Sequence, residues 1–245
     1  MENKNDNLEP NLSDEESVEE LAVSDALIGV ITSPGETFET IAVNKRKNYW
    51  LLSVIVSIVI GIVITFIFFK DEQLINGLMD KQRDQLEKQM EEKVKEGKMS
   101  PEQSNQAIEQ AEKFMDPKSL FFQVIGYGGA TLVPLLMLFV LSLVYLLLLK
   151  MFKAEIDFGN IMNVVGLPMI ITVIGAIVGL VLSVLLGKMS SLSPALLYSE
   201  GKLGDFLLKF DLFTAWYYAA VSIGLSKLAK ILSCKSYVMV FVVWL

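Results

Sequence analysis

The residues that most often carry chemistry are scarce in this sequence. The 245 residues include no histidine and a single cysteine, Cys234. A disulfide within one chain is therefore impossible, and zinc, haem and cysteine–histidine nucleophile sites lack their usual ligands. Serine and threonine are present, but neither is a nucleophile by default without a paired base. We therefore predict no catalytic, cofactor-binding or metal-binding residue, and we expect a protein that is not an enzyme.

The elements that would have to position any site are long apolar stretches. Four of them contain no Asp, Glu, Lys or Arg: Tyr49–Phe69, Phe121–Leu149, Asn160–Gly187 and Leu212–Ser226. A helix of about 20 apolar residues crosses a hydrocarbon core about 30 Å thick, and the first three stretches reach that length. Lipid offers no partner for backbone N–H and C=O groups, so each stretch should be helical. A soluble chain of this size with 53% hydrophobic residues could hardly bury all four.

The last two apolar runs are shorter. Leu212–Ser226 would be roughly 23 Å long as a helix, with Asp211 placed as its N-cap. Ser236–Leu245 would cover only about 15 Å, half a bilayer. We therefore predict an all-α fold: a polytopic membrane helix bundle of four full spans plus a short or truncated fifth, with a helical hairpin outside the membrane.

Small residues and prolines within the spans suggest where helices approach and bend. Glycines or alanines spaced for contact let helix backbones come close, and a proline in mid-span weakens the backbone hydrogen-bond ladder. The same residues could instead line a substrate path. The packing candidates are Gly126, Gly129, Ala130, Gly175 and Gly179, and the kink candidates are Pro134 and Pro168.

Basic and aromatic residues at the span ends predict the orientation. Basic residues followed by Tyr and Trp are typical of a cytoplasmic membrane interface. The basic residues near the span ends divide into two groups, and the group that includes residues 45–47, 150, 153, 227, 230 and 235 should be cytoplasmic. This places the N-terminus in the cytoplasm. The predicted interface anchors are Lys45, Arg46, Lys47, Tyr49, Trp50 and Trp216.

The chain before the first span divides into two segments. Residues 1–25 hold nine acidic residues and one lysine, and we expect a disordered acidic tail that lacks a cleavable signal peptide. Residues 26–69 form an amphipathic lead and the first span. Ser33-Pro34-Gly35-Glu36 has the pattern of a capping box, and we expect the helix that it starts to lie on the membrane surface.

The only long polar segment, residues 70–118, separates the first two spans. Apolar residues recur on one face of a run rich in Glu, Lys and Gln, and Ser100-Pro101-Glu102-Gln103 resembles a second helix start. Asp116-Pro117 then ends the second helix. We predict a polar helical hairpin, either a solvated loop that packs on itself or an arm that binds a partner, followed by a membrane helix bundle over residues 119–245.

Three groups of residues occur in a recognisable order. The first is Ile31–Phe38 (ITSPGETF), ahead of a Trp-led span; the second is Met151-Phe152-Lys153, followed by Phe158, Gly166 and Pro168. The third is Phe210–Trp216 (FDLFTAW), which continues to Ile223–Ser226 (IGLS). Together they resemble the bacterial branch of the Yip family, the Ypt/Rab-interacting membrane proteins with five helices. The likeness covers about Ala26–Phe69 and Phe121–Leu245, with the polar hairpin as an insertion.

The resemblance implies a membrane topology but leaves the function largely open. For eukaryotic members it would imply binding of lipidated Rab GTPases and a role in vesicle traffic, but the Asp-Leu-Tyr-Gly-Pro type of motif is absent here. We therefore expect a non-enzymatic organising or interaction scaffold of the bacterial cytoplasmic membrane. Its expected partners are the lipid bilayer and other membrane proteins or a second copy, without nucleic acid or metal. A small transporter or permease component is the alternative, although no ionisable residue lies inside the four stretches.

Overall fold

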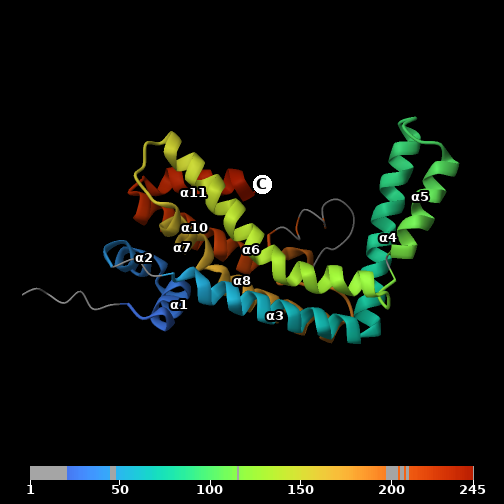
Figure 1. Ribbon diagram of the computed structural model, residues 1–245, viewed down its shortest axis with the longest axis horizontal. Coiled ribbons are helices and arrows are strands. Elements are labelled where there is room, and N and C mark those ends of the chain that lie inside the picture. The colour runs from blue at the N-terminus through green and yellow to red at the C-terminus, as the bar shows by residue number, and fades with distance from the viewer. Residues whose placement is uncertain are drawn as a thin grey trace, which may run out of the picture.

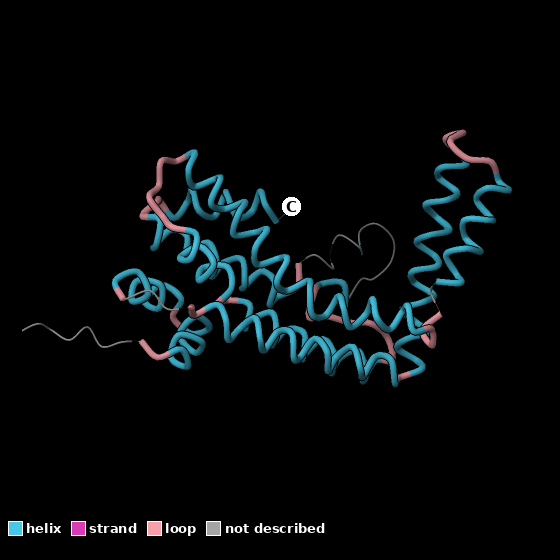
Figure 2. Tube along the Cα trace, in the orientation of Figure 1, coloured by secondary structure: helices cyan, strands magenta, loops and turns pink. Residues whose placement is uncertain are grey.

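A computed structural model describes residues 21–44, 48–114, 116–196, 204, 207 and 210–244. Within these residues the chain is helical throughout its regular structure, and no strand occurs (Figure 2). The predicted all-α class is therefore confirmed. The elements are α1 Val23–Thr32, α2 Pro34–Val43, α3 Trp50–Lys70, α4 Glu72–Lys95, α5 Pro101–Phe114, α6 Leu120–Met151, α7 Phe158–Gly166, α8 Met169–Leu186, the 3-10 turn η1 Pro194–Leu196, α10 Leu212–Ala229 and α11 Ser233–Trp244.

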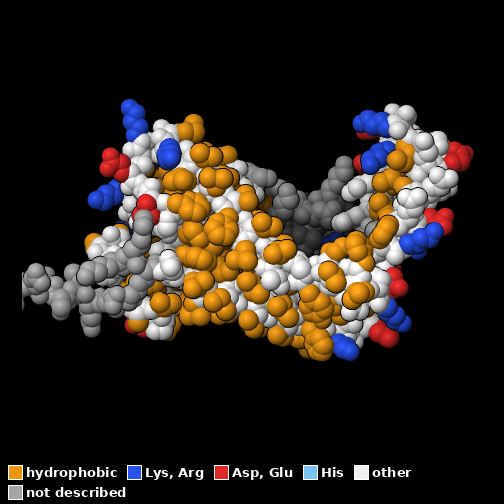
Figure 3. Space-filling model, in the orientation of Figure 1, with side chains coloured by type: hydrophobic (Ala, Val, Ile, Leu, Met, Phe, Trp, Pro, Cys, Tyr) orange, Lys and Arg blue, Asp and Glu red, His pale blue; other side chains and the backbone are white. Residues whose placement is uncertain are grey.

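Three helical segments in the described residues are long and apolar enough to cross a membrane. They are Trp50–Lys70, Leu120–Met151 and Phe158–Leu186, the last of which combines α7 and α8. Hydrophobic side chains cover a broad area of the surface between two ends that carry charged side chains (Figure 3). The prediction of four full spans and a fifth is thus wrong in number. α10 has 18 residues but is not apolar enough to count as a span, and α11, with 12 residues, is too short.

The shortfall of α10 has a physical reason. Its 18 residues include Trp216, two tyrosines, three serines or threonines and Lys227, which make it less apolar than the other spans. Eight of its residues are buried in the protein, including Tyr217, Val221 and Leu225. One side of α10 is therefore buried in the bundle, while Leu212 and Trp216 remain exposed on its outer side. α11 has 12 residues, about 18 Å of helix, and is too short to cross by itself.

The helices run between two ends of the molecule (Figure 1). At the first, here called the α2 end, lie α1, α2, the loop after α6 and the start of α11. At the second, the hairpin end, α3 ends, α6 begins and α8 ends. α3 packs against α6 and α8, while α10 packs against α2, α7, α8 and α11. α6 contains Pro134 and changes direction along its length, as a proline inside a helix favours.

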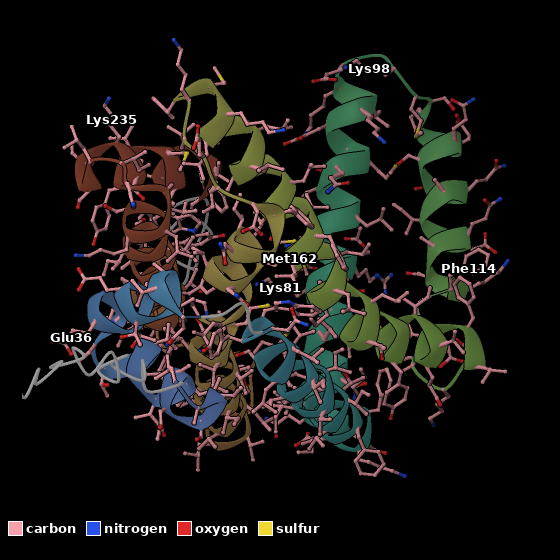
Figure 4. All side chains as sticks on the ribbon, turned by 60° about the vertical axis from the view of Figure 1, so that its left-hand side comes forward. Glu36, Lys81, Lys98, Phe114, Met162 and Lys235 are labelled. Atoms are coloured by element: carbon pink, nitrogen blue, oxygen red, sulfur yellow. The ribbon has the colours of Figure 1, made fainter. Side chains whose placement is uncertain are left out.

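The α2 end holds the main hydrophobic core. Phe38 from α2, Tyr145 and Leu149 from α6, Ile161 from α7 and Leu225 from α10 are all fully buried within it. Met162 of α7, 7% exposed and labelled in Figure 4, belongs to the same core. Elements far apart in the sequence therefore share one packed centre.

The short helices α1 and α2 dock on this core as a pair. α2 packs its face with Phe38 and Ile41 against α10, and Lys227 of α10 forms an ion pair with Glu39. The capping box predicted at Ser33–Glu36 is wrong, because the Ser33 side chain makes no cap hydrogen bond. The Ser33 N–H instead bonds the Gly29 carbonyl, so α1 runs almost directly into α2 and leaves no room for a separate cap.

The hairpin end carries α4 and α5, which stand apart from the rest of the bundle (Figure 1). Asp71 caps α4 by accepting the N–H groups of Gln73 and Leu74. The box predicted at residues 100–103 is confirmed: Gln103 N–H donates to the Ser100 hydroxyl, and Ser100 N–H donates to the Gln103 side chain. Arg83 ties the two helices together through an ion pair with Glu112, 3.0 Å long.

Candidate functional site

The third span is interrupted where α7 ends and α8 begins. Pro168 has no N–H to donate to the helix ladder, so the hydrogen bonding changes at this point. The Leu167 N–H still reaches the Asn163 carbonyl, and the Ile171 N–H bonds the Pro168 carbonyl. In a membrane, carbonyls that such a break releases need other partners or become a binding site.

Side chains from two other helices donate to carbonyls at this break, where the Leu167 carbonyl also accepts the Ile170 N–H at 3.4 Å. The Ser53 hydroxyl of α3 donates to the Leu167 carbonyl at 2.9 Å, and the Tyr217 hydroxyl of α10 donates to the Val165 carbonyl at 3.2 Å. Ser53 is fully buried and Tyr217 is 7% exposed. The break is thereby sealed by protein, and these two carbonyls are not left to coordinate an ion.

The same point joins the start of α3 to α7. The Trp50 N–H donates to the Asn163 side-chain oxygen at 3.3 Å, and Asn163 is 2% exposed. Gly166 lies so close to Trp50 that a Cβ atom there would meet the Trp50 Cβ at 2.5 Å. Gly224 of α10 allows a similar approach nearby, where a Cβ would meet Val164 at 2.8 Å and Phe38 at 2.9 Å. Four helices therefore converge on a closed, hydrogen-bonded junction.

Towards the hairpin end, α8 packs against the chain that follows it. Phe213, in the first turn of α10, lies against Gly175, and the Ser190 carbonyl lies against Gly179. α8 continues to Leu186, 11 residues and about 16 Å beyond Gly175. The chain after α8 therefore folds back along the helix, and α10 begins within the depth that α8 crosses. The Ser190 N–H donates to the Ser183 hydroxyl at 2.9 Å and fixes this return.

A cavity of about 400 Å³ lies beside this returning chain. Its polar lining comes from α8, the return and the start of α10: Thr172, Ser183, Ser190, Ser191, Asp211 and Thr214. Asp211 accepts the backbone N–H groups of Phe213 and Thr214, which confirms its predicted role as an N-cap. The cavity could hold a small polar group, but the described residues contain no cluster of His, Cys, Asp or Glu suited to a metal.

The profile of the Yip1 domain matches residues 28–245, which is most of the chain. The chain belongs to the Yip1 domain family. It is accordingly a multi-pass membrane protein whose apolar helices contact the lipid bilayer. No curated protein and no solved structure gives a significant match.

Within this Yip1 domain the small residues singled out in the sequence lie in different settings. A Cβ on Gly126 would meet the ring of Phe69 at 2.7 Å, and Ala130 lies against Gly61 at the junction of α3 and α6. Gly175 and Gly179 face Phe213 and Ser190, as described above. Gly129 differs, because a Cβ there would have no heavy atom within 4 Å.

The predicted interface anchors are also divided. Tyr49 is 1% exposed, and its hydroxyl donates to the Leu21 carbonyl, so its ring packs inside the α2 end. Trp50 is half-buried against Gly166, whereas Trp216 is 46% exposed on the outside of α10. Lys45, Arg46 and Lys47 lie outside the described residues.

Sequence reasoning missed the side chains that seal the break. Pro168 marked the place, and Asn163 was an amide inside an apolar run, which is a signal for an internal hydrogen bond. Ser53 and Tyr217 gave no such signal, because a serine or tyrosine in a span can bond its own helix or point outward. Asp211 was recognised as a cap, but its position at the depth of Gly175 follows only from the contact between α8 and α10.

Proposed function

We propose that this Yip1 domain protein is a non-enzymatic scaffold that organises other membrane proteins. The observation that supports this best is the sealed break, in which Ser53 and Tyr217 occupy the carbonyls of Leu167 and Val165. A transporter that binds its substrate at a broken helix needs such groups free. The three spans also carry no Asp, Glu, Lys or Arg except Lys70 and Lys150 at their ends.

The surface suited to a partner is the α4–α5 hairpin. It extends from the bundle, with Lys98 at its tip (Figure 4), and carries interspersed acidic and basic side chains. The exposed ion pair of Arg83 with Glu112 joins the two helices, while that of Lys113 with Glu109 lies within α5. A preformed polar arm of this kind suits another membrane protein or a second copy of this chain.

The scaffold role is tested by site-specific photocrosslinking in native membranes. A photoreactive amino acid at Lys88 or Glu91 on the hairpin should give discrete adducts with protein partners. The same amino acid at Val59 or Leu143, which are exposed on the apolar spans, serves as the matched control and should react mainly with lipid. Equal adduct patterns at both sets of positions would contradict the role of the hairpin.

We place the protein in a bacterial cytoplasmic membrane with its N-terminus in the cytoplasm and the hairpin on the other side. Lys227 forms an ion pair with Glu39, and Lys235 lies over the Phe152 ring. These contacts support the proposal that the basic residues assigned to the cytoplasm lie at one end of the molecule. Cysteines at Glu36 and Asn105, both exposed, should label from opposite sides with an impermeant maleimide in a Cys234→Ser background. Labelling from one side alone would overturn this topology.

A transporter component remains the second candidate because of Asp211. An ionisable group at membrane depth, beside a polar cavity and a returning chain, is typical of a substrate path. Asn is a good N-cap, so Asp211→Asn removes the charge and keeps the start of α10. The scaffold proposal expects no substrate-dependent proton flux in liposomes; proton-coupled uptake that Asp211→Asn abolishes would establish the transporter instead.

A further inference from the structure

A second and larger cavity lies where the spans meet the hairpin. Its volume is about 680 Å³, within the range of about 300–1,000 Å³ that small-molecule sites occupy. The last turns of α3, the first turns of α6 and the facing sides of α4 and α5 all contribute to its walls. Phe114, at the base of α5 and beside the start of α6, marks one side of it (Figure 4).

The lining determines what can enter. It consists almost wholly of apolar side chains such as Phe69, Leu78 and Ile125, and only Thr65 and Gln82 contribute polar ones. The Thr65 hydroxyl is already committed to the Gly61 carbonyl of its own helix at 2.8 Å. A site that holds water needs several polar partners, so this cavity suits a hydrocarbon group.

The cavity is continuous with the surface that faces lipid. Phe66, Phe121 and Ile125 occupy the same ends of α3 and α6 and are 53%, 54% and 55% exposed. These helix ends belong to spans, so their exposed sides lie at the edge of the hydrocarbon core. A chain from a neighbouring lipid can therefore reach the cavity from the side, while the hairpin covers it from the direction of water.

Three exposed lysines adjoin residues that line the cavity, and the Lys70 ammonium lies over the Phe66 ring, 5.8 Å from its centre. Lys70 follows Phe69, Lys188 precedes Met189 and Lys118 lies three residues before Phe121, and each of these neighbours lines the cavity. Gly187, which follows α8 directly, lies beside Gln73 of α4 and brings the Lys188 segment to the base of the hairpin.

These lysines differ from those farther along the hairpin. Lys95, Lys98 and Lys113 form ion pairs with Glu91, Glu96 and Glu109. Lys70, Lys118 and Lys188 form none with any residue in the described ranges.

The nearest carboxylates keep their negative charge, but none forms an ion pair with the three lysines among the described residues. Asp71 accepts the backbone N–H groups of Gln73 and Leu74, and Asp116 accepts that of Lys118. The edge of the cavity therefore carries three ammonium groups that form no ion pair with a described residue, together with the charged Asp71 and Asp116. Lysines at the boundary of the membrane attract anionic lipid headgroups.

We propose that this cavity binds one acyl chain of an anionic phospholipid, whose phosphate lies among Lys70, Lys118 and Lys188. The apolar walls select the chain, and the lysines select the charge of the headgroup. The bound lipid would fill the space between the spans and the hairpin and hold the hairpin at a fixed place on the membrane surface. This site is independent of whether the hairpin also binds a protein.

The proposal is tested with the purified full chain and two probes, phosphatidylglycerol and phosphatidylcholine with identical acyl chains. Native mass spectrometry should show one tightly retained phosphatidylglycerol and at least tenfold weaker retention of phosphatidylcholine. Ala111→Phe places a ring in the cavity and should weaken phosphatidylglycerol binding at least tenfold. Ala107→Phe, one turn away on α5 and outside the lining, is the matched control and should leave binding unchanged.

Charge variants separate the headgroup from the chain. Lys70→Gln, Lys118→Gln and Lys188→Gln combined should abolish the preference for phosphatidylglycerol, whereas the corresponding change of Lys95, Lys98 and Lys113 should preserve it. A phospholipid with a diazirine near the end of its acyl chain should label peptides of α3, α5 and α6 that line the cavity in the unaltered protein. Equal binding by Ala111→Phe, an unchanged preference in the first triple variant, or labelling spread evenly over the spans would overturn the proposal.

Discussion

The two ends of the bundle differ in how closely their helices pack. At the α2 end, Gly166 and Gly224 bring helices into contact around a core in which Phe38 and Tyr145 are fully buried. At the hairpin end, Gly175 and Gly179 also allow close approach, but to the first turn of α10 and to a returning loop. A cavity of about 400 Å³ remains beside these two glycines, and one of about 680 Å³ lies between the spans and the hairpin.

The difference follows from what each end contains. The α2 end includes a broken helix whose carbonyls must be satisfied inside the protein, so close packing there is required for stability. The larger cavity of the hairpin end lies where spans leave the hydrocarbon core and loops can vary, whereas the smaller one reaches deeper, to Gly175. Space and lysines without ion pairs cost less at that edge than at the centre of the bundle, and binding sites tend to occur in such regions.

The largest expected effect comes from adding methyl groups at the α2 end. Gly166→Ala combined with Gly224→Ala should destabilise the protein by about 2–6 kcal/mol, because each new Cβ overlaps a neighbouring helix and the two costs add. Thermal unfolding in mild detergent measures the change. Gly128→Ala with Gly129→Ala is the control, since no heavy atom lies within 4 Å of either added Cβ. A stable double variant at 166 and 224 would mean that this end is not closely packed.

A smaller loss is expected from larger changes at the hairpin end. Gly175→Leu combined with Gly179→Leu should cost about 1–3 kcal/mol, because the added side chains displace Phe213 and the Ser190 backbone. The returning loop has cavity space into which it can move, which limits the damage. The same detergent unfolding assay applies. If the double variant behaves like the parent, the contact between α8 and the returning chain is not formed.

Removing one hydroxyl at the break should have a smaller effect on stability. Comparing two serines of α3 shows whether a hydrogen bond between helices contributes more than one within a helix. Ser53→Ala leaves the Leu167 carbonyl without its interhelical donor and should cost about 0.6–1.7 kcal/mol. Ser57→Ala, one turn along α3, removes a bond to the carbonyl of its own helix and should cost less. Unfolding midpoints of the two variants compare these losses directly; equal values would remove Ser53 from the junction.

The smallest effect concerns acid and the start of α5. The pKa of Glu102 is lowered, first by its own backbone N–H and then by the Ser100 hydroxyl. A carboxyl whose pKa is lower in the folded state stabilises that state above its unfolded pKa, about 4.3, and loses this contribution as pH falls through the folded value. Glu102→Gln should therefore slightly reduce the dependence of the unfolding midpoint on pH below about 5. An identical pH profile would show that Glu102 does not contribute.

Local sequence signals predicted the helices well where a helix depends on its own residues. Asp211 and the Ser100–Gln103 box act as the sequence indicates, because a cap needs only residues within one turn. The box at Ser33 failed because the preceding helix uses the Ser33 N–H. The modest apolarity of α10 can be read from its own residues, but its start at the depth of Gly175 could not be predicted, because it depends on the contact between Phe213 and Gly175.

The hydrogen bonds that join α3 to α7 at the break could not be predicted from the sequence. Trp50 and Asn163 are 113 residues apart, and Ser53 and Leu167 are 114 apart. Nothing within either segment specifies its partner, because many pairings of apolar helices satisfy the same hydrophobic pattern. Pro168 predicted that hydrogen bonds would be lost, but not which side chains would replace them.

The modest apolarity of α10 has a consequence for how the protein is made. With Trp216, Tyr217 and Lys227, this helix has a weaker tendency to leave the translocation machinery for lipid than the three spans before it. Its polar groups find partners on elements that are synthesised earlier: the Val165 carbonyl for Tyr217 and Glu39 for Lys227. We therefore expect α10 to enter the membrane late, against helices already in place, so that the order of synthesis is also the order in which its partners become available.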